Sequence, residues 1–337
     1  MAEPFLRLPR EERSQILQTL APRMGLSSVV LQKDVWVCWV LEKLFQMPRR
    51  LRMAFKGGTS LSKVYGVIHR FSEDIDITLD FRSLHPECDP FHQALSRTKL
   101  KKLGEKLKAS VQRHAHEIIH PYLVNLIQEL EPEGGARVAI SEDGESIRIY
   151  YASATGDASA YVTDSVLVEL GGRNVTEPCE EHQVTTFLAG SLDGLALPCA
   201  RVIVLSPLRT FWEKATLIHV ECHRQGPKSK ADRLSRHWYD LALLAQHQIG
   251  EQALLRRDLL EQVVAHKKIF FDCSFAHYDD CLEGHLQLIP EDSLLTGLEK
   301  DYEQMKRAGM FYAKPPSFVT LIEQLRRTQS TVNASRS

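Results

Sequence analysis

Cysteine is scarce in this chain and follows no short-spaced pattern. The 337 residues include seven cysteines, an odd number scattered along the sequence. This argues against a disulfide framework and fits a reducing compartment. The most apolar early stretch, VWVCWVLEKLF, is far shorter than the roughly 20 residues that a membrane span needs. The charged start has no long apolar run behind it, so no signal peptide is expected. We therefore expect a cytoplasmic protein with no membrane contact.

No charge of one sign dominates either. Lys and Arg number 42 against 43 Asp and Glu, which gives a formal net charge of −1. A global basic field is excluded, so any nucleic-acid surface must be a local patch. Apolar residues make up 43% of the chain, which is enough for a sizeable core. There is no internal repeat and no low-complexity tract.

Hydrophobic periodicity divides the chain into three parts. Residues 1–205 mix helical and strand patterns, residues 206–330 are almost wholly helical, and 331–337 form a polar tail that we expect to be frayed. The first part begins with two helices, the second over Ser28–Phe45 and apolar nearly all round. We predict an α+β fold, in which a mixed sheet flanked by helices is followed by a mostly helical domain.

The stretch FKGGTSLSKVYGVIHRFSEDIDITLDF, residues 55–81, combines several features that carry chemistry. A short strand ends at Gly57 and Gly58, a helical pattern follows over residues 60–69, and residues 74–81 alternate as in a half-buried strand. The stretch is not a P-loop, because that motif needs its lysine directly after the second glycine. Here Lys56 precedes the glycine pair.

Asp74 and Asp76 are two residues apart on the predicted strand and so point the same way. Two neighbouring carboxylates repel each other unless a cation lies between them, and oxygen ligands of this kind suit Mg²⁺. Gly57 and Gly58 allow close approach of the backbone to a phosphate, and Thr59 adds a hydroxyl. Read without a function, the same residues are a solvated strand face and a plain turn.

A third carboxylate would let the site hold two metal ions. Glu169 is the candidate, because it is a lone acid in the apolar strand pattern VLVELGG. A glycine turn beside three carboxylates is an arrangement for moving a nucleotidyl or phosphoryl group, and Ser60 would add a further hydroxyl at the turn.

Two other kinds of cluster are present. Basic residues gather at Arg97–Lys108, again at Lys228, Lys230, Arg233 and Arg236, and at Lys267 and Lys268. They predict either contacts with an RNA backbone or solvated helix faces. Cys273, His277, Cys281 and His285 recur at every fourth residue, but a zinc site would need one continuous helix whose face turns away over that length. His219 and His223 lack the acid position of a zinc-protease helix.

Several separate segments resemble one family. Residues 55–77 resemble the signature of the AbiEii/AbiGii-type nucleotidyltransferase toxins, a branch of the DNA polymerase β-like nucleotidyltransferase superfamily. Further segments that resemble that family's pattern are QKDVWVCWVLEKLF, VLVELGGR, PLRTFWEKATLIHVECHR, RLSRHWYDL, DYEQM and PPSF. The resemblance covers most of the chain.

The resemblance implies roles for individual residues. The phosphates of an NTP would be held by Lys56, Gly57, Gly58, Thr59 and Ser60. Asp74, Asp76 and Glu169 would bind Mg²⁺, two ions in all. Ser72 resembles the serine two positions before the first metal-binding aspartate. Lys214 would neutralise the triphosphate, and Asp240 matches the family's final aspartate. Read from the residues alone, Lys214 is a solvated helix lysine and Asp240 an acid paired with an arginine such as Arg236.

The function that the resemblance implies is transfer of NMP from an NTP to RNA, with a tRNA 3′ end as the expected acceptor. Such a monomeric enzyme would act as the toxin of a toxin–antitoxin or abortive-infection system, block translation, and have a cognate antitoxin as partner. Two alternatives stay open: transfer onto a protein such as the antitoxin, and a non-catalytic nucleotide-binding regulator.

Overall fold

The computed structural model describes residues 3–87, 89–91, 95–132, 135–155, 163–224 and 233–334. The chain divides into two compact units. Unit 1 contains residues 1–64, 71–89 and 102–204, and unit 2 contains residues 65–70, 90–101 and 205–337.

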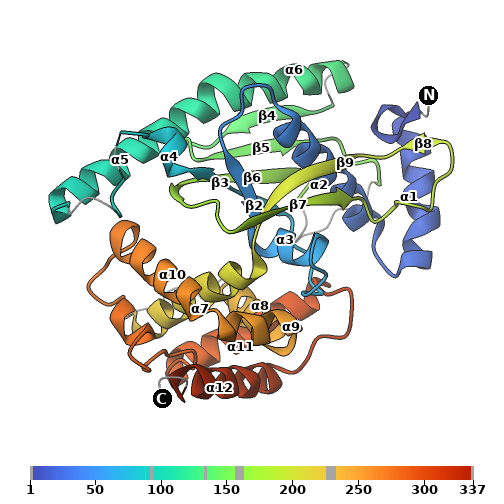
Figure 1. Cartoon of the computed structure of the whole chain (residues 1–337). Coiled ribbons are helices and arrows are strands. Elements are labelled where there is room, and N and C mark those ends of the chain that lie inside the picture. The colour runs from blue at the N-terminus through green and yellow to red at the C-terminus, as the bar shows by residue number, and fades with distance from the viewer. Residues whose placement is uncertain are drawn as a thin grey trace. The chain divides into compact units, whose positions relative to one another are not determined.

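Unit 1 is built on a mixed sheet (Figure 1). Within the described residues this sheet has seven strands in the order β4-β5-β6-β3-β2-β9-β7. The strands are β2 (Met53–Lys56), β3 (Asp74–Asp80), β4 (Arg137–Ile140), β5 (Ser146–Tyr150), β6 (Ser165–Asn174), β7 (Cys179–Thr185) and β9 (Cys199–Leu205). β3 runs antiparallel to β2 and parallel to β6. A separate pair joins β1 (Glu3–Pro4) to β8 (Leu195–Ala196).

Helices flank this sheet. They are α1 (Arg10–Met24), α2 (Ser28–Gln46), α3 (Gly57–Lys63), α4 (Phe81–Leu84), α5 (Arg97–His114) and α6 (His120–Leu130), with a 3₁₀ turn at Phe5–Arg7 and a π-helical turn at Ala115–Ile119. α2 begins where the Ser27 side chain accepts a hydrogen bond from Val30 N, and most of its residues are buried, as its apolar sequence predicts. The predicted fold class is therefore confirmed.

β3 has two different faces, as its alternating sequence predicts. Ile75, Ile77 and Leu79 are at most 1% exposed and belong to the core. Asp74 and Asp76 alternate with them and are half-buried. The strand therefore presents its carboxylates on the face opposite to its core side chains.

The helix after the glycine pair is shorter than predicted. α3 ends at Lys63, and residues 67–69, expected to be helical, have no regular structure. The hairpin predicted around Asp143–Gly144 is present, because β4 and β5 pair on either side of it and Gly144 has φ of 67°. Glycine reaches this left-handed conformation without steric cost.

Unit 2 contains the remaining helices: α7 (Pro207–His223), α8 (Ser235–Gln246), α9 (Gln248–Leu255), α10 (Arg257–Phe270), α11 (Asp292–Arg307) and α12 (Phe318–Ala334), with a 3₁₀ turn at Tyr278–Cys281. α7 starts at a proline because the Ser206 side chain accepts from Leu208 N, and proline lacks only an N–H that would be unpaired there. Trp212 and Trp238 are fully buried, and their indole N–H groups donate to Ala253 O and Leu288 O.

The end of the chain differs from expectation. α12 continues to Ala334, so the frayed tail predicted to begin at residue 331 is wrong for residues 331–334. Val332 is 1% exposed, and its carbonyl accepts from Arg257 Nη1 at 3.2 Å. A buried side chain in the last turn outweighs the polar composition of this segment.

In the described part of the chain, no single helix has the length and hydropathy of a membrane span. α1 and α2 pass such a test only as a pair, and they meet at a bend of 107°.

Candidate active site

Three neighbouring strands of unit 1 align the predicted nucleotide-binding and metal-binding side chains in one row. In the register of the sheet, Lys56 of β2 pairs with Asp76 of β3, and Asp76 pairs with Glu169 of β6. Side chains paired across neighbouring strands lie on the same face. Asp74 lies two residues before Asp76 and shares its side of β3. The structure thus brings Lys56, Asp74, Asp76 and Glu169 together.

The first glycine of the pair is required by the aspartate beside it. Gly57 has φ of 78°, and a Cβ added there would overlap the Asp76 carboxylate. The carboxylate therefore lies directly against the backbone of the turn. Any larger residue at position 57 would be strained and would also displace Asp76.

The hydroxyls of the turn are engaged within the protein. Thr59 and Ser60 are 0% exposed. The Thr59 hydroxyl lies 2.5 Å from Asp74 O and 2.9 Å from the Ser72 hydroxyl, whereas Ser60 donates to Gly57 O at 2.9 Å. Thr59 and Ser72 thus join α3 to the strand that carries the aspartates. The part of the turn left for a phosphate is its backbone, and Lys56 lies beside it at the end of β2.

A pocket of about 270 Å³ opens beside this row. Its lining residues are Lys56, Asp76, Ile77, Asp143, Glu145, Ser146, Glu169, Leu170, Gly171 and Asn174. Lys56, Asp76 and Glu169, which are in register across the three strands, line this pocket, so their side chains meet solvent there. Asp76 and Glu169, with Asp74 beside them, are three carboxylates that fit the oxygen-rich ligand set of a divalent cation.

Several residues of this region were not anticipated from the sequence. Asp143, Glu145 and Asn174 reach the pocket through the β4–β5 turn and the end of β6. Lys33 of α2 is 1% exposed and donates to Glu73 and to Thr163 O. Burial lowers the pKa of Lys33, and the charges of Glu73 and Asp74 oppose that shift. Glu73, the acid next to Asp74, is therefore held by the buried Lys33. In the sequence, the only indication of this contact is a lysine within an apolar helix.

Lys214 and Asp240 lie in unit 2 and contact each other. Lys214 Nζ lies 2.8 Å from Asp240 Oδ2. Arg70 completes the group, because its Nε and Nη2 donate to the two Asp240 oxygens at 2.7 and 2.8 Å. The partner of Asp240 is thus Arg70, where the alternative reading named Arg236. All three residues are at most 8% exposed.

Electrostatics keep this group ionised. Burial alone would raise the pKa of the Asp240 carboxyl, but the charges of Arg70 and Lys214 outweigh burial and hold that pKa well below its usual range. Burial lowers the pKa of Lys214, and the carboxylate of Asp240 opposes the shift. Since both Asp240 oxygens are occupied, this residue acts here as a fixed anion that holds two cations.

The basic clusters differ in exposure. Lys101, Lys102, Lys106 and Arg113 of α5 are exposed, whereas Leu103, Leu107 and Val111 of the same helix are buried. Lys267 donates to Glu213 O, and Lys268 pairs with Asp279. Lys228 and Lys230 lie outside the described residues. The cluster on α5 therefore presents several exposed basic side chains on one helix.

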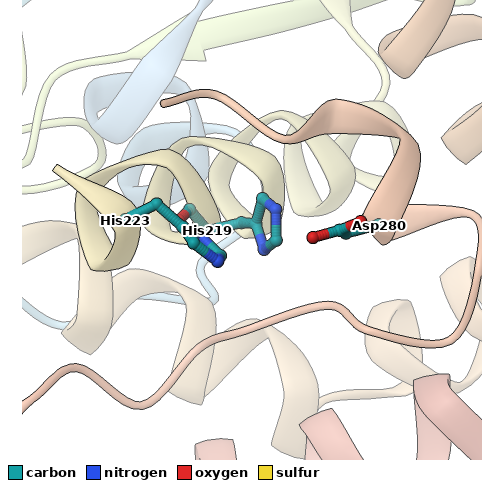
Figure 2. Close-up of side chains that lie close together, drawn as sticks. All are labelled: His219, His223 and Asp280. Atoms are coloured by element: carbon teal, nitrogen blue, oxygen red, sulfur yellow. The ribbon is translucent and has the colours of Figure 1, made fainter. Parts of the chain in front are cut away.

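A second titratable cluster lies in unit 2 (Figure 2). His219 and His223 project from α7 toward Asp280, and their nearest ligand atoms lie within 4.8 Å of one another. Two histidines one turn apart and a carboxylate are residues that can bind zinc. Residues 273–285, which carry a cysteine or histidine at every fourth position, do not form the continuous helix that a zinc site would need. Their helical structure is limited to the 3₁₀ turn at Tyr278–Cys281.

The hydrogen bonds of His219 argue against a metal site. Its Nδ1 accepts from Gln287 N at 2.9 Å, and its Nε2 lies 3.0 Å from His277 O. A backbone N–H only donates and a carbonyl only accepts, so His219 is neutral with its proton on Nε2. A cation on Nε2 would move that proton to Nδ1, against the Gln287 N–H. The cluster fits a buried structural histidine better than a zinc ligand.

This histidine predicts acid sensitivity. Burial lowers the pKa of His219 from 6.5 to about 4. Between these values the unfolded chain binds a proton that the folded chain does not, so stability is full above pH 6.5 and falls as the pH drops towards 4. At about 1.4 kcal/mol per pH unit, we expect a loss of about 3 kcal/mol in urea unfolding. His219→Gln keeps one donor and one acceptor and should flatten this slope.

His285→Gln, which changes an exposed histidine, is the matched control and should leave the slope unchanged. An identical pH slope in wild type and His219→Gln would contradict the neutral, buried state of His219.

A mixed sheet that carries a glycine turn beside a row of carboxylates has the arrangement of a nucleotidyltransferase. The family described as "Nucleotidyl transferase AbiEii toxin, Type IV TA system" matches residues 39–324. The chain therefore belongs to the AbiEii family of nucleotidyltransferase toxins, and the resemblance seen in the sequence is confirmed. The family implies an NTP substrate and an antitoxin partner.

Among solved structures, the chain is similar to MenT4, a nucleotidyltransferase toxin from Mycobacterium tuberculosis H37Rv. The two share 17% sequence identity with a TM-score of 0.44, over 97% of this chain and 99% of the other. No curated protein matches the sequence significantly.

Proposed function

We propose that this enzyme is a Mg²⁺-dependent RNA nucleotidyltransferase that adds NMP to an RNA 3′ end, with tRNA as the acceptor. Modified in this way, the tRNA could not be aminoacylated, and translation would stop. The proposed enzyme acts as a monomer in the cytoplasm and is neutralised by its antitoxin. The observation that carries the proposal is the row of Lys56, Asp76 and Glu169 across three strands, beside the glycine turn.

In the reaction, the acceptor hydroxyl oxygen forms a bond to the α-phosphorus of the NTP. The bond between this phosphorus and the bridging oxygen breaks, pyrophosphate leaves with the electron pair of that bond, and the hydroxyl proton passes to solvent. Asp74, Asp76 and Glu169 would hold two Mg²⁺ ions. When bound, such ions neutralise phosphate charge and lower the pKa of the attacking hydroxyl.

The chain's own groups bind and orient the reactants. The backbone at Gly57 and Gly58 would receive the phosphates, because no side chain blocks their approach. Lys56 lies beside Asp76 in the row and would attract the same anions. Lys214, which Asp240 holds within unit 2, keeps the role that the family resemblance gives it, to offset the charge of the leaving pyrophosphate. Preorganised charges of this kind supply most of the catalysis in phosphoryl and nucleotidyl transfer.

An RNA acceptor is supported by the exposed basic face of α5. Lys102, Lys106 and Arg113 follow a spacing of four and seven residues, which places them on one side of the helix. Contacts between such side chains and phosphates give affinity without sequence information.

The test is transfer of label from α-³²P NTPs, offered one at a time with Mg²⁺ to separate RNA and protein fractions. We expect label at RNA 3′ ends, none from γ-³²P NTP, and none in EDTA. Label confined to protein would overturn the RNA assignment in favour of protein modification. Absence of transfer to either fraction would overturn the proposed reaction.

A further inference from the structure

The order of the strands separates the two sides of the transfer reaction. β2, which leads into the glycine turn, lies on one side of β3, and β6 lies on the other. Attacking and leaving oxygens lie on opposite sides of the phosphorus during the transfer. If the leaving pyrophosphate lies at the glycine turn, as the proposed function requires, the acceptor hydroxyl arrives from the side of Glu169. That is the side on which the 270 Å³ pocket continues to the β4–β5 turn.

The chemistry of this pocket suits a nucleoside better than a phosphate. Beyond the row, the pocket is lined by Asp143, Glu145, Ser146 and Asn174. The two acids would repel phosphate groups but can accept hydrogen bonds from ribose hydroxyls and exocyclic amines. The terminal nucleoside of an RNA, which carries the attacking hydroxyl, has these donors.

A β-bulge brings Asn174 into the pocket. β3 and β6 pair at Thr78↔Gly171 and again at Asp80↔Asn174, so three steps along β6 match two along β3. Without the extra residue, strand alternation from Glu169 and Gly171 would place Arg173 on the pocket face. The bulge places Asn174 there instead, which is a recurrent use of bulges beside active sites.

Both glycines before Asn174 support this placement. A Cβ added at Gly171 would lie 3.1 Å from Asn174 Nδ2, so the amide lies closely over Gly171. A Cβ at Gly172 would overlap Val111 of α5 and lie 2.8 Å from Leu84 Cδ1. Within the described part of the chain, the Asn174 amide makes no hydrogen bond to another residue.

The basic helix is attached to the same pocket. Lys108 Nζ of α5 lies 2.9 Å from Glu145 Oε2, and Gln112 Nε2 donates to Asp143 O at 2.6 Å. The exposed side chains of Lys102, Lys106 and Arg113 continue along that helix. A nucleic-acid backbone on α5 would therefore end near the acidic turn that lines the pocket.

We infer that the pocket beside Glu169 is the acceptor subsite: it receives the terminal nucleoside of an RNA whose backbone lies along α5, and Asn174 reads the base of that nucleoside. An amide presents a donor and an acceptor side by side and can pair with the edge of a base. This inference rests on the proposed function and adds which part of the acceptor the enzyme recognises and by which residues.

The test uses the full chain with synthetic RNAs that differ only in their terminal nucleoside, and Asn174→Ala and Asn174→Ser as variants. For wild type we expect the kcat/KM values for the best and worst termini to differ on the order of tenfold or more. Both variants should lower this ratio towards one and raise KM for the RNA, with KM for the NTP unchanged. Asn125→Ala, on the exposed face of α6, is the matched control and should behave as wild type.

Lys106→Glu separates the backbone contact from base recognition. It should weaken RNA binding uniformly across all four termini, and more at low salt than at high salt, because it removes a phosphate contact. A loss of terminal discrimination in this variant would contradict the division of roles between α5 and the pocket.

Two outcomes overturn the inference in distinguishable ways. If wild type labels RNA but the Asn174 variants keep full terminal discrimination, or lose NTP affinity instead, the acceptor subsite is wrong and the proposed function stands. If wild type labels no RNA, the proposed function fails and the inference fails with it. Unchanged NTP affinity in the variants also shows that the site remains folded.

Discussion

Asp76→Asn is expected to reduce NMP transfer by roughly 1,000-fold or more while the protein stays folded. The substitution keeps the size of the side chain and removes the charge at the centre of the row, between Lys56 and Glu169. Loss of a metal ligand removes several kcal/mol of charge stabilisation in the transition state, and about 1.4 kcal/mol corresponds to a tenfold change in rate.

The measurement is the initial rate with α-³²P NTP and RNA, together with the melting temperature. Because Asp76 is half-buried and next to another acid, neutralising it should leave the melting temperature unchanged or slightly raised. Asp193→Asn, an exposed aspartate elsewhere in unit 1, is the control and should keep full activity. Near-normal transfer by Asp76→Asn would show that the metal ions bind elsewhere.

Asp240→Asn is expected to destabilise the fold by about 3–5 kcal/mol in urea unfolding. The substitution removes the anion that holds Arg70 and Lys214, and it leaves two cations buried at no more than 8% exposure. Removing one partner of a buried ion pair is costly because the remaining charge has lost both its solvent and its counter-charge.

An exposed ion pair in the same unit provides a matched control. Asp258 pairs with Arg256 through two bonds of 2.7 Å, the same kind of bidentate contact, but at the surface. Asp258→Asn should cause no measurable loss, because surface pairs are screened by water and salt. The triple variant Arg70→Met, Lys214→Met, Asp240→Leu should recover much of the stability lost in Asp240→Asn. An Asp240→Asn protein that is fully stable but inactive would instead assign Asp240 to the reaction.

The features predicted correctly from the sequence are those in which a local pattern of residues specifies one local structure. The alternation of DIDITLD specifies a strand with its carboxylates on one face, and β3 has that form. The lone acid in VLVELGG marks a strand position where a charge needs a reason, and Glu169 lies in register with Asp76. Periodicity also gave α2 and the helices after Pro207, since burial of an apolar face depends on spacing alone.

Contacts between distant segments could not be predicted in this way. Arg70 and Asp240 are 170 residues apart in the sequence. Nothing in the sequence around Arg70 marks it as the partner of Asp240 in preference to an arginine close by in the chain, such as Arg236. Asn174 was missed because strand alternation assigns Arg173 to the pocket face, and only the pairing with β3 reveals the bulge.

The sequence by itself determined the class of this protein. Its glycine turn, paired aspartates and family motifs are local patterns, and each depends on only a few neighbouring residues. The tertiary structure alone decided how these patterns combine: which carboxylates share a row, which arginine neutralises Asp240, and which side chain the bulge of β6 turns into the pocket. The physical reason is that strand register and burial are set by many weak contacts across the chain, which no short stretch of sequence contains.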